Sequence, residues 1–166
     1  ERAAAIAIQL CRFLEDVDRV EASETGPSRL TLLHNDIKPT NVRVVGTDRV
    51  KVLDFGAAKA LSLSRRVTRN DFGSIAYLSP ECLETGERDR RTDAWALGVL
   101  LYEMVAGRAP FRADDPGRLE HLIRSGRPPA PPEACPIALQ AVIAKILAPE
   151  PADRYENAKA IREDLE

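Results

Sequence analysis

Apolar residues recur at helical spacing in five stretches of the chain. Side chains three and four positions apart are apolar and those between them are polar, which is typical of a helix with one buried face. The pattern predicts helices over residues 3–17, 92–106, 115–124, 136–147 and 156–165. The second of these is apolar on almost every side, which indicates a helix buried all round. Thr92 or Asp93 is expected to cap its start and Gly107 its end.

Two short runs rich in valine, residues 42–45 and 50–53, predict a small β-hairpin, with Gly46-Thr47-Asp48 as its turn. The stretch from residue 56 to about residue 91 has weak periodicity and is predicted to be a loop. Together these elements predict a mainly α fold, with about five or six helices and one hairpin around a single core.

Composition narrows the possible partners and the setting. The 166 residues carry 24 basic and 26 acidic side chains, a net charge of −2, which argues against binding nucleic acid through bulk positive potential. No apolar run has the length of a membrane span. Three scattered cysteines, Cys11, Cys82 and Cys135, favour a reducing, cytoplasmic setting in which they fill the core.

Five short motifs carry the candidate chemistry. The first is His34-Asn35-Asp36-Ile37-Lys38-Pro39-Thr40-Asn41, and the second, Asp54-Phe55-Gly56, begins thirteen residues after it. Ser79-Pro80-Glu81, Asp93-Ala94-Trp95-Ala96-Leu97-Gly98 and Arg154 follow. Each motif alone is weakly specific, but five motifs in this order and at compatible spacings are a specific signal. The set resembles the Hanks-type serine/threonine protein kinases, and its wording is most similar to that of bacterial members.

The resemblance implies a role for each motif residue. Asp36 and Lys38 would be catalytic: Asp36 accepts the proton of the substrate hydroxyl and Lys38 places a positive charge on the transferred phosphate. Lys38, Asn41 and Asp54 would bind ATP and Mg²⁺, with Asn41 and Asp54 as oxygen ligands of the metal. Ser74 would bridge Asp36 and Lys38, and Glu81 would form a buried ion pair with Arg154. Structural roles are implied for His34, Phe55, Gly56, Ser74, Glu81, Asp93 and Arg154.

The resemblance also implies the domain organisation. It identifies residues 1–166 as the C-terminal lobe of a kinase, with the catalytic loop at 34–41, the activation segment at 54–81 and a helical subdomain at 92–166. The Gly-rich phosphate loop and the strand lysine of the N-terminal lobe do not occur in the sequence. We therefore expect this chain to need two partners, the N-terminal lobe and a protein substrate, and to be inactive alone.

One position departs from the family pattern. The family's catalytic loop usually has Arg before the catalytic Asp, where this chain has Asn35. That Arg normally holds a phosphorylated activation segment through a charge-assisted contact. Candidate phosphorylation sites are Ser62, Ser64 and Thr68. Without the Arg, we expect activity to depend little on their phosphorylation.

Two other functional classes fit parts of the sequence. A pseudokinase or scaffold lobe would keep the fold without the chemistry, although Asp36, Lys38, Asn41 and Asp54 are all present. A small-molecule phosphotransferase of the aminoglycoside-kinase type shares the His-x-Asp pattern and the Asn that follows it. Lys38, Ser79-Pro80-Glu81 and Arg154 favour the protein kinases instead.

Overall fold

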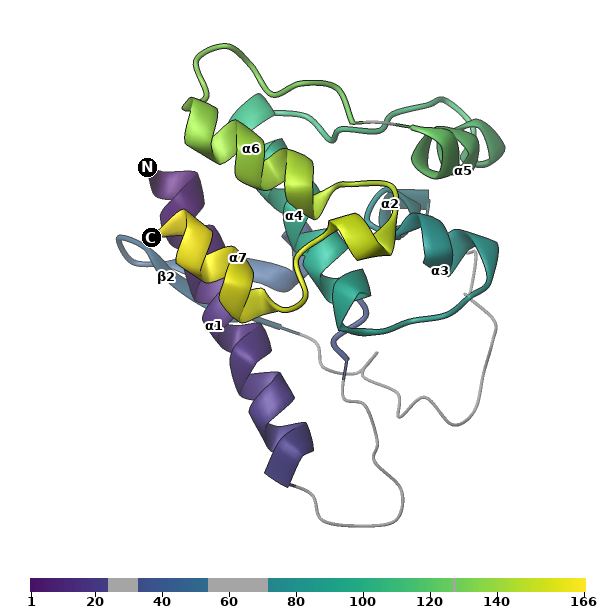
Figure 1. Ribbon diagram of the computed structural model, residues 1–166. Coiled ribbons are helices and arrows are strands. Elements are labelled where there is room, and N and C mark those ends of the chain that lie inside the picture. Colours follow the sequence, from purple (N-terminus) through teal and green to yellow (C-terminus); the bar gives the residue numbers. More distant parts are fainter. Residues whose placement is uncertain (24–32, 54–71, 127) are drawn as a thin grey trace.

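The computed structural model describes residues 1–23, 33–53, 72–126 and 128–166, which are mainly helical (Figure 1). Its α-helices are α1 (Arg2–Ser23), α2 (Phe72–Ile75), α3 (Pro80–Glu84), α4 (Arg90–Ala106), α5 (Pro116–Ser125), α6 (Ile137–Ile146) and α7 (Ala158–Leu165). Two short 3₁₀ helices, η1 (Pro39–Asn41) and η3 (Pro151–Asp153), and two strands, β1 (Val42–Val45) and β2 (Arg49–Val52), complete the described elements. The predicted fold class is confirmed.

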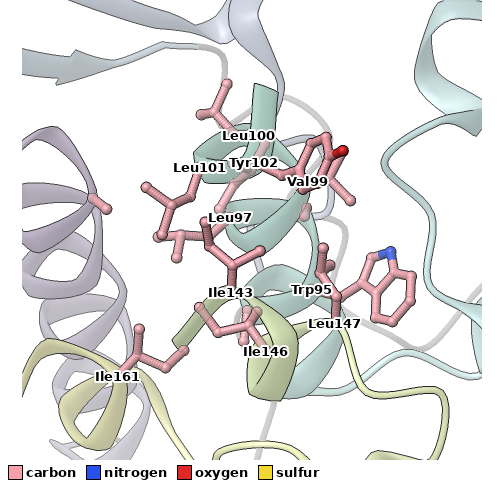
Figure 2. Close-up of a cluster of buried hydrophobic side chains, with 14 of the residues drawn as sticks. Trp95, Leu97, Val99, Leu100, Leu101, Tyr102, Ile143, Ile146, Leu147 and Ile161 are labelled. Carbon is pink, nitrogen blue, oxygen red and sulfur yellow. The ribbon is translucent and has the colours of Figure 1, made fainter. Parts of the chain in front are cut away.

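Helix α4 forms the centre of the core. Every residue from 92 to 102 is buried, as the apolar pattern of this stretch predicts. Figure 2 shows its side chains meeting those of α6 and α7, with Leu97, Ile143 and Ile161 in the same cluster. Helix α1 packs against both α4 and α7. Arg162 of α7 also donates to Glu15 of α1 over 2.7 Å.

The hairpin has the predicted turn and first strand, and its second strand lies one residue earlier than predicted, at Arg49–Val52. Strands β1 and β2 pair antiparallel, with Val42 opposite Val52 and Val45 opposite Arg49. Gly46 opens the turn at a φ of 65°, a conformation that glycine adopts without strain. At the open end of the hairpin, Leu53 N donates to Asn41 O over 2.8 Å. The chain segments on either side of the turn are therefore held together at both ends.

The start of α4 differs from the prediction. Its N-cap is Asp89, whose side chain accepts from Arg91 N, while Thr92 is the reciprocal partner in a capping box. Asp93 lies inside the first turn and uses its carboxylate elsewhere. The other end is as predicted, with Gly107 in the left-handed conformation at a φ of 68°.

The predicted loop from residue 56 to residue 91 is wrong for its described part. Residues 72–91 hold α2, α3 and the beginning of α4. Helices of four and five residues are too short to repeat an apolar period, so the sequence pattern does not reveal them. Pro80 begins α3, a position where its missing N–H and fixed φ favour helix.

The three cysteines lie in the core as expected, and none forms a disulfide. Burial raises the pKa of Cys11 to about 12, so this thiol is not ionised at neutral pH. Within the described parts of the chain, no helix is long and apolar enough to span a membrane.

Gly98 tests how closely the central helices pack. A Cβ at this position would overlap the Ile146 side chain and lie 3.0 Å from Leu147 Cδ2. We expect Gly98→Ala to lower the free energy of unfolding by about 1–3 kcal/mol, the usual cost of overpacking a core. The control is Gly117→Ala in α5, where the added methyl meets only Asp115 Oδ1 at 3.4 Å. Urea denaturation of both variants measures the difference, and equal stabilities would contradict the close approach.

Candidate functional site

Four polar side chains of the first motif and of α2 meet at one point. Lys38 Nζ lies 3.0 Å from Asp36 Oδ1 and donates to Ser74 Oγ over 2.9 Å. Asn41 Nδ2 donates to Asp36 Oδ2 over 2.7 Å and to the Asp36 carbonyl over 2.9 Å. The Asp36 carboxylate is thus held on one side by an ammonium group and on the other by an amide. It is about a quarter exposed, so a substrate can reach it.

Loop 34–41 owes its position to the first turn of α4. The buried Asp93 carboxylate accepts from His34 N and from Asn35 N, each over 2.8 Å. Burial raises the pKa of Asp93, and the two N–H donors oppose that rise by stabilising the ionised form. Asn35 has a φ of 62°, a left-handed conformation that Asn tolerates better than most residues. Asn35 therefore adopts this conformation while the backbone N–H groups of His34 and Asn35 stay bonded to α4.

The His34 side chain supports the loop from within. It is fully buried, and its Nε2 lies 3.2 Å from the Leu53 carbonyl at the end of the hairpin. Its Nδ1 lies 3.4 Å from Asp36 N, and its ring meets the Phe13 ring edge-on with centroids 5.9 Å apart. These contacts give His34 a packing position beneath the loop.

The segment after α2 is tied to α4 by a second polar contact. The Tyr77 hydroxyl donates to the Glu103 carboxylate, and burial together with that carboxylate raises the pKa of Tyr77. Tyr77 N also donates to the Ser74 carbonyl over 3.2 Å, which links this contact to the residue whose hydroxyl Lys38 binds.

Arg154 forms a third tie, close to the Ser79-Pro80-Glu81 motif. Its guanidinium donates to both Glu81 oxygens, over 2.8 and 3.0 Å, and to the carbonyls of Ala148 and Pro149. It also lies over the Trp95 ring, 4.5 Å from the centroid. The Arg154 side chain is 2% exposed and that of Glu81 is 21% exposed. The pair implied by the family resemblance is present and mostly buried.

Most of the chain is similar in sequence to a known family. The family model for the protein kinase domain matches residues 29–165. The chain belongs to the protein kinase family. It is 38% identical over 139 residues to serine/threonine-protein kinase PknB of Mycobacterium leprae and 41% identical over 138 residues to a probable serine/threonine-protein kinase of Clostridium acetobutylicum. Each alignment covers 81% of this chain but only 22% and 21% of the relative.

A third relative, a probable serine/threonine-protein kinase of Corynebacterium efficiens, is 35% identical over 99% of this chain and 25% of its own length. The chain thus spans about a fifth to a quarter of the curated kinases that it matches. Kinases of this family generally use ATP and Mg²⁺.

Three motif residues and the three candidate phosphorylation sites lie outside the described residues. They are Asp54, Phe55, Gly56, Ser62, Ser64 and Thr68. Leu53, the residue before Asp54, is described, and its N–H is bonded to the Asn41 carbonyl.

The described donors suit a hard cation. Mg²⁺ prefers carboxylate and amide oxygens. Both hydrogen bonds that the Asn41 side chain makes to described residues use its NH₂ group, which leaves the amide oxygen for a ligand. Asp36 presents its carboxylate beside it. No cluster of three His, Cys, Asp or Glu side chains that could hold a metal occurs within the ranges described.

Glu103 is a site residue that the sequence analysis missed. A signal was available, because it is the one charged residue between Asp93 and Arg108 in an otherwise apolar stretch. Such a charge in a buried helix usually has a partner, and here the partner is Tyr77.

A double-mutant cycle tests the tie between the Ser79-Pro80-Glu81 motif and Arg154. We expect Glu81→Ala and Arg154→Ala each to lower the free energy of unfolding by about 3 kcal/mol, because each leaves a partly buried charge without its partner. The double variant should lose less than the sum of the two, since both singles remove the same interaction. Urea denaturation gives the three values.

The matched control for this cycle is the exposed pair Lys159 and Glu163, whose side chains are 63% and 56% exposed. Removing it should change stability by no more than about 0.5 kcal/mol. Additive losses in the Glu81 and Arg154 series would show that the two charges do not depend on each other.

Proposed function

We propose that this chain is the C-terminal lobe of a serine/threonine protein kinase that transfers the γ-phosphate of ATP to Ser or Thr of protein substrates. The observation that carries the proposal is the hydrogen-bonded group of Asp36, Lys38, Asn41 and Ser74. Phosphoryl transfer depends on positioning and charge neutralisation more than on covalent help. The accessible Asp36 carboxylate can position the substrate hydroxyl, and the Lys38 ammonium beside it can neutralise phosphate charge.

Each of these side chains has a step to perform. Asp36 accepts the proton of the substrate hydroxyl as the hydroxyl oxygen forms its bond to the γ-phosphorus. Lys38 stabilises negative charge on the transferred group, and Ser74 keeps the Lys38 ammonium beside Asp36. Asn41, with Asp54 by sequence, offers oxygen ligands to Mg²⁺, which neutralises phosphate charge when bound. The bond to the leaving ADP oxygen breaks as the new bond forms.

Support for serine and threonine as acceptors comes from Lys38. A Lys two residues after the catalytic Asp marks this class within the family, and its ammonium is bonded to Ser74 rather than directed to solvent. The relatives named above are serine/threonine kinases by name.

A second lobe would complete the nucleotide site. The hairpin carries exposed apolar side chains, Val44, Val45 and Leu53, which favour contact with another part of the kinase. In the family, the N-terminal lobe supplies the phosphate loop and the Lys that orients the nucleotide.

The test of the catalytic role uses a longer protein that contains this chain together with an N-terminal lobe. Asp36→Asn should reduce phosphate transfer to a Ser/Thr peptide by about 10²–10⁴-fold, the usual effect of losing a general base. The control is Asp16→Asn, which makes the same change of carboxylate to amide on the exposed face of α1. Near-normal turnover by Asp36→Asn would disprove the role of Asp36, and no turnover by the parent would favour a scaffold function.

The isolated chain provides a second test. Residues 1–166 alone should transfer no phosphate and bind Mg·ATP only weakly, because half of the family's nucleotide contacts belong to the other lobe. Calorimetric titration measures the affinity. A dissociation constant in the low micromolar range or tighter would contradict the need for that lobe.

A further inference from the structure

The outer edge of the hairpin is bonded to the side chain of Gln9 in α1. Gln9 Nε2 donates to the Asp48 carbonyl over 2.7 Å, and Val50 N donates to Gln9 Oε1 over 3.0 Å. Asp48 and Val50 are two residues apart, so their free backbone groups face the same edge of the strand. The Gln9 amide thus pairs with β2 as a peptide group of a neighbouring strand would.

This contact is the main polar attachment of the hairpin to α1. The other described one, Arg2 Nε to Asp48 Oδ1 at 3.0 Å, joins side chains that are 70% and 53% exposed. Exposed ion pairs contribute little to stability. Gln9 is partly buried and makes two hydrogen bonds to the hairpin backbone at once. Figure 1 shows the hairpin against the N-terminal half of α1, where Gln9 lies.

The hairpin in turn carries one of the site residues. Asn41 directly precedes β1, and its carbonyl accepts from Leu53 N at the end of β2. A two-stranded hairpin is marginally stable by itself, so its orientation depends on what it packs against. A tilt of the hairpin would move Asn41 away from Asp36, to which it donates over 2.7 Å.

We propose that Gln9 is a positioning residue: by pairing with the edge of β2, it fixes the hairpin and so sets the place of the Asn41 amide oxygen that binds Mg²⁺. This inference rests on the proposed function, because it takes Asn41 as a metal ligand. Gln9 itself touches neither the nucleotide nor the metal. Its effect is therefore on metal affinity, and not on the rate of the chemical step.

The experiment uses the longer kinase that contains this chain, with Gln9→Met to keep the length and apolar stem of the side chain while removing the amide. The control is Arg12→Ala, in the same helix, which removes a contact with Glu166 of α7 and leaves the hairpin untouched. Three quantities are measured: hydrogen exchange at the Val50 amide, the affinity for Mg·ADP by calorimetry, and turnover against Mg²⁺ concentration.

For Gln9→Met we expect exchange at Val50 to accelerate about tenfold, equivalent to about 1.4 kcal/mol. We also expect Mg·ADP to bind roughly three- to tenfold more weakly, with turnover within about twofold of the parent's once Mg²⁺ saturates. Arg12→Ala should change none of the three.

Faster exchange with unchanged Mg·ADP affinity would overturn the proposal, because Gln9 would then be only structural. Unchanged exchange would overturn it as well. If the parent binds Mg·ADP but transfers no phosphate, the proposed function fails, while weaker binding by Gln9→Met would still support the positioning role. A parent that does not bind Mg·ADP overturns both.

Discussion

The buried Asp93 carboxylate is the interaction on which the candidate site depends. It lies in the first turn of α4, where the helix dipole favours negative charge, and it accepts two backbone N–H groups of loop 34–41. A buried carboxylate without such donors would be costly, so the loop and the helix stabilise each other. The Asp36 carboxylate comes one residue after the second of these N–H groups, which fixes where the proposed general base can lie.

The segment from α2 to α3 approaches the same helix from another direction. Glu103 of α4 holds Tyr77, and the Arg154 guanidinium joins Glu81 to the face of Trp95. Ser74, near the start of this segment, then meets Lys38 of the loop. Two segments far apart in sequence therefore converge on one ammonium group because both are bonded to α4.

The sequence predicts the long helices and the hairpin, but it does not predict the helix cap or the contacts that join these elements. The helix over 92–106 follows from its unbroken apolar run, and the turn Gly46-Thr47-Asp48 follows from the glycine between valine-rich strands. The predicted N-cap of α4 was wrong, because Asp89 caps the helix and the Asp93 carboxylate binds the loop instead. Nothing in the pattern distinguishes Gln9 from an ordinary polar residue on an amphipathic helix, since its partners are backbone groups about forty residues away.

Asp36 and Asn41 are supported by different helices, and their mutual hydrogen bond is where the two supports meet. Loop 34–41 is bonded at its start to α4 through Asp93, whereas its end continues into a hairpin that is bonded to α1 through Gln9. α1 packs directly on α4, so the two supports belong to one core. Loss of the Gln9 contact alone would therefore act first on the Asn41 end of the loop, while the Asp93 hydrogen bonds still hold the end that carries Asp36. We therefore expect that metal affinity can be altered separately from proton transfer, although the Asp36 and Asn41 side chains are in contact.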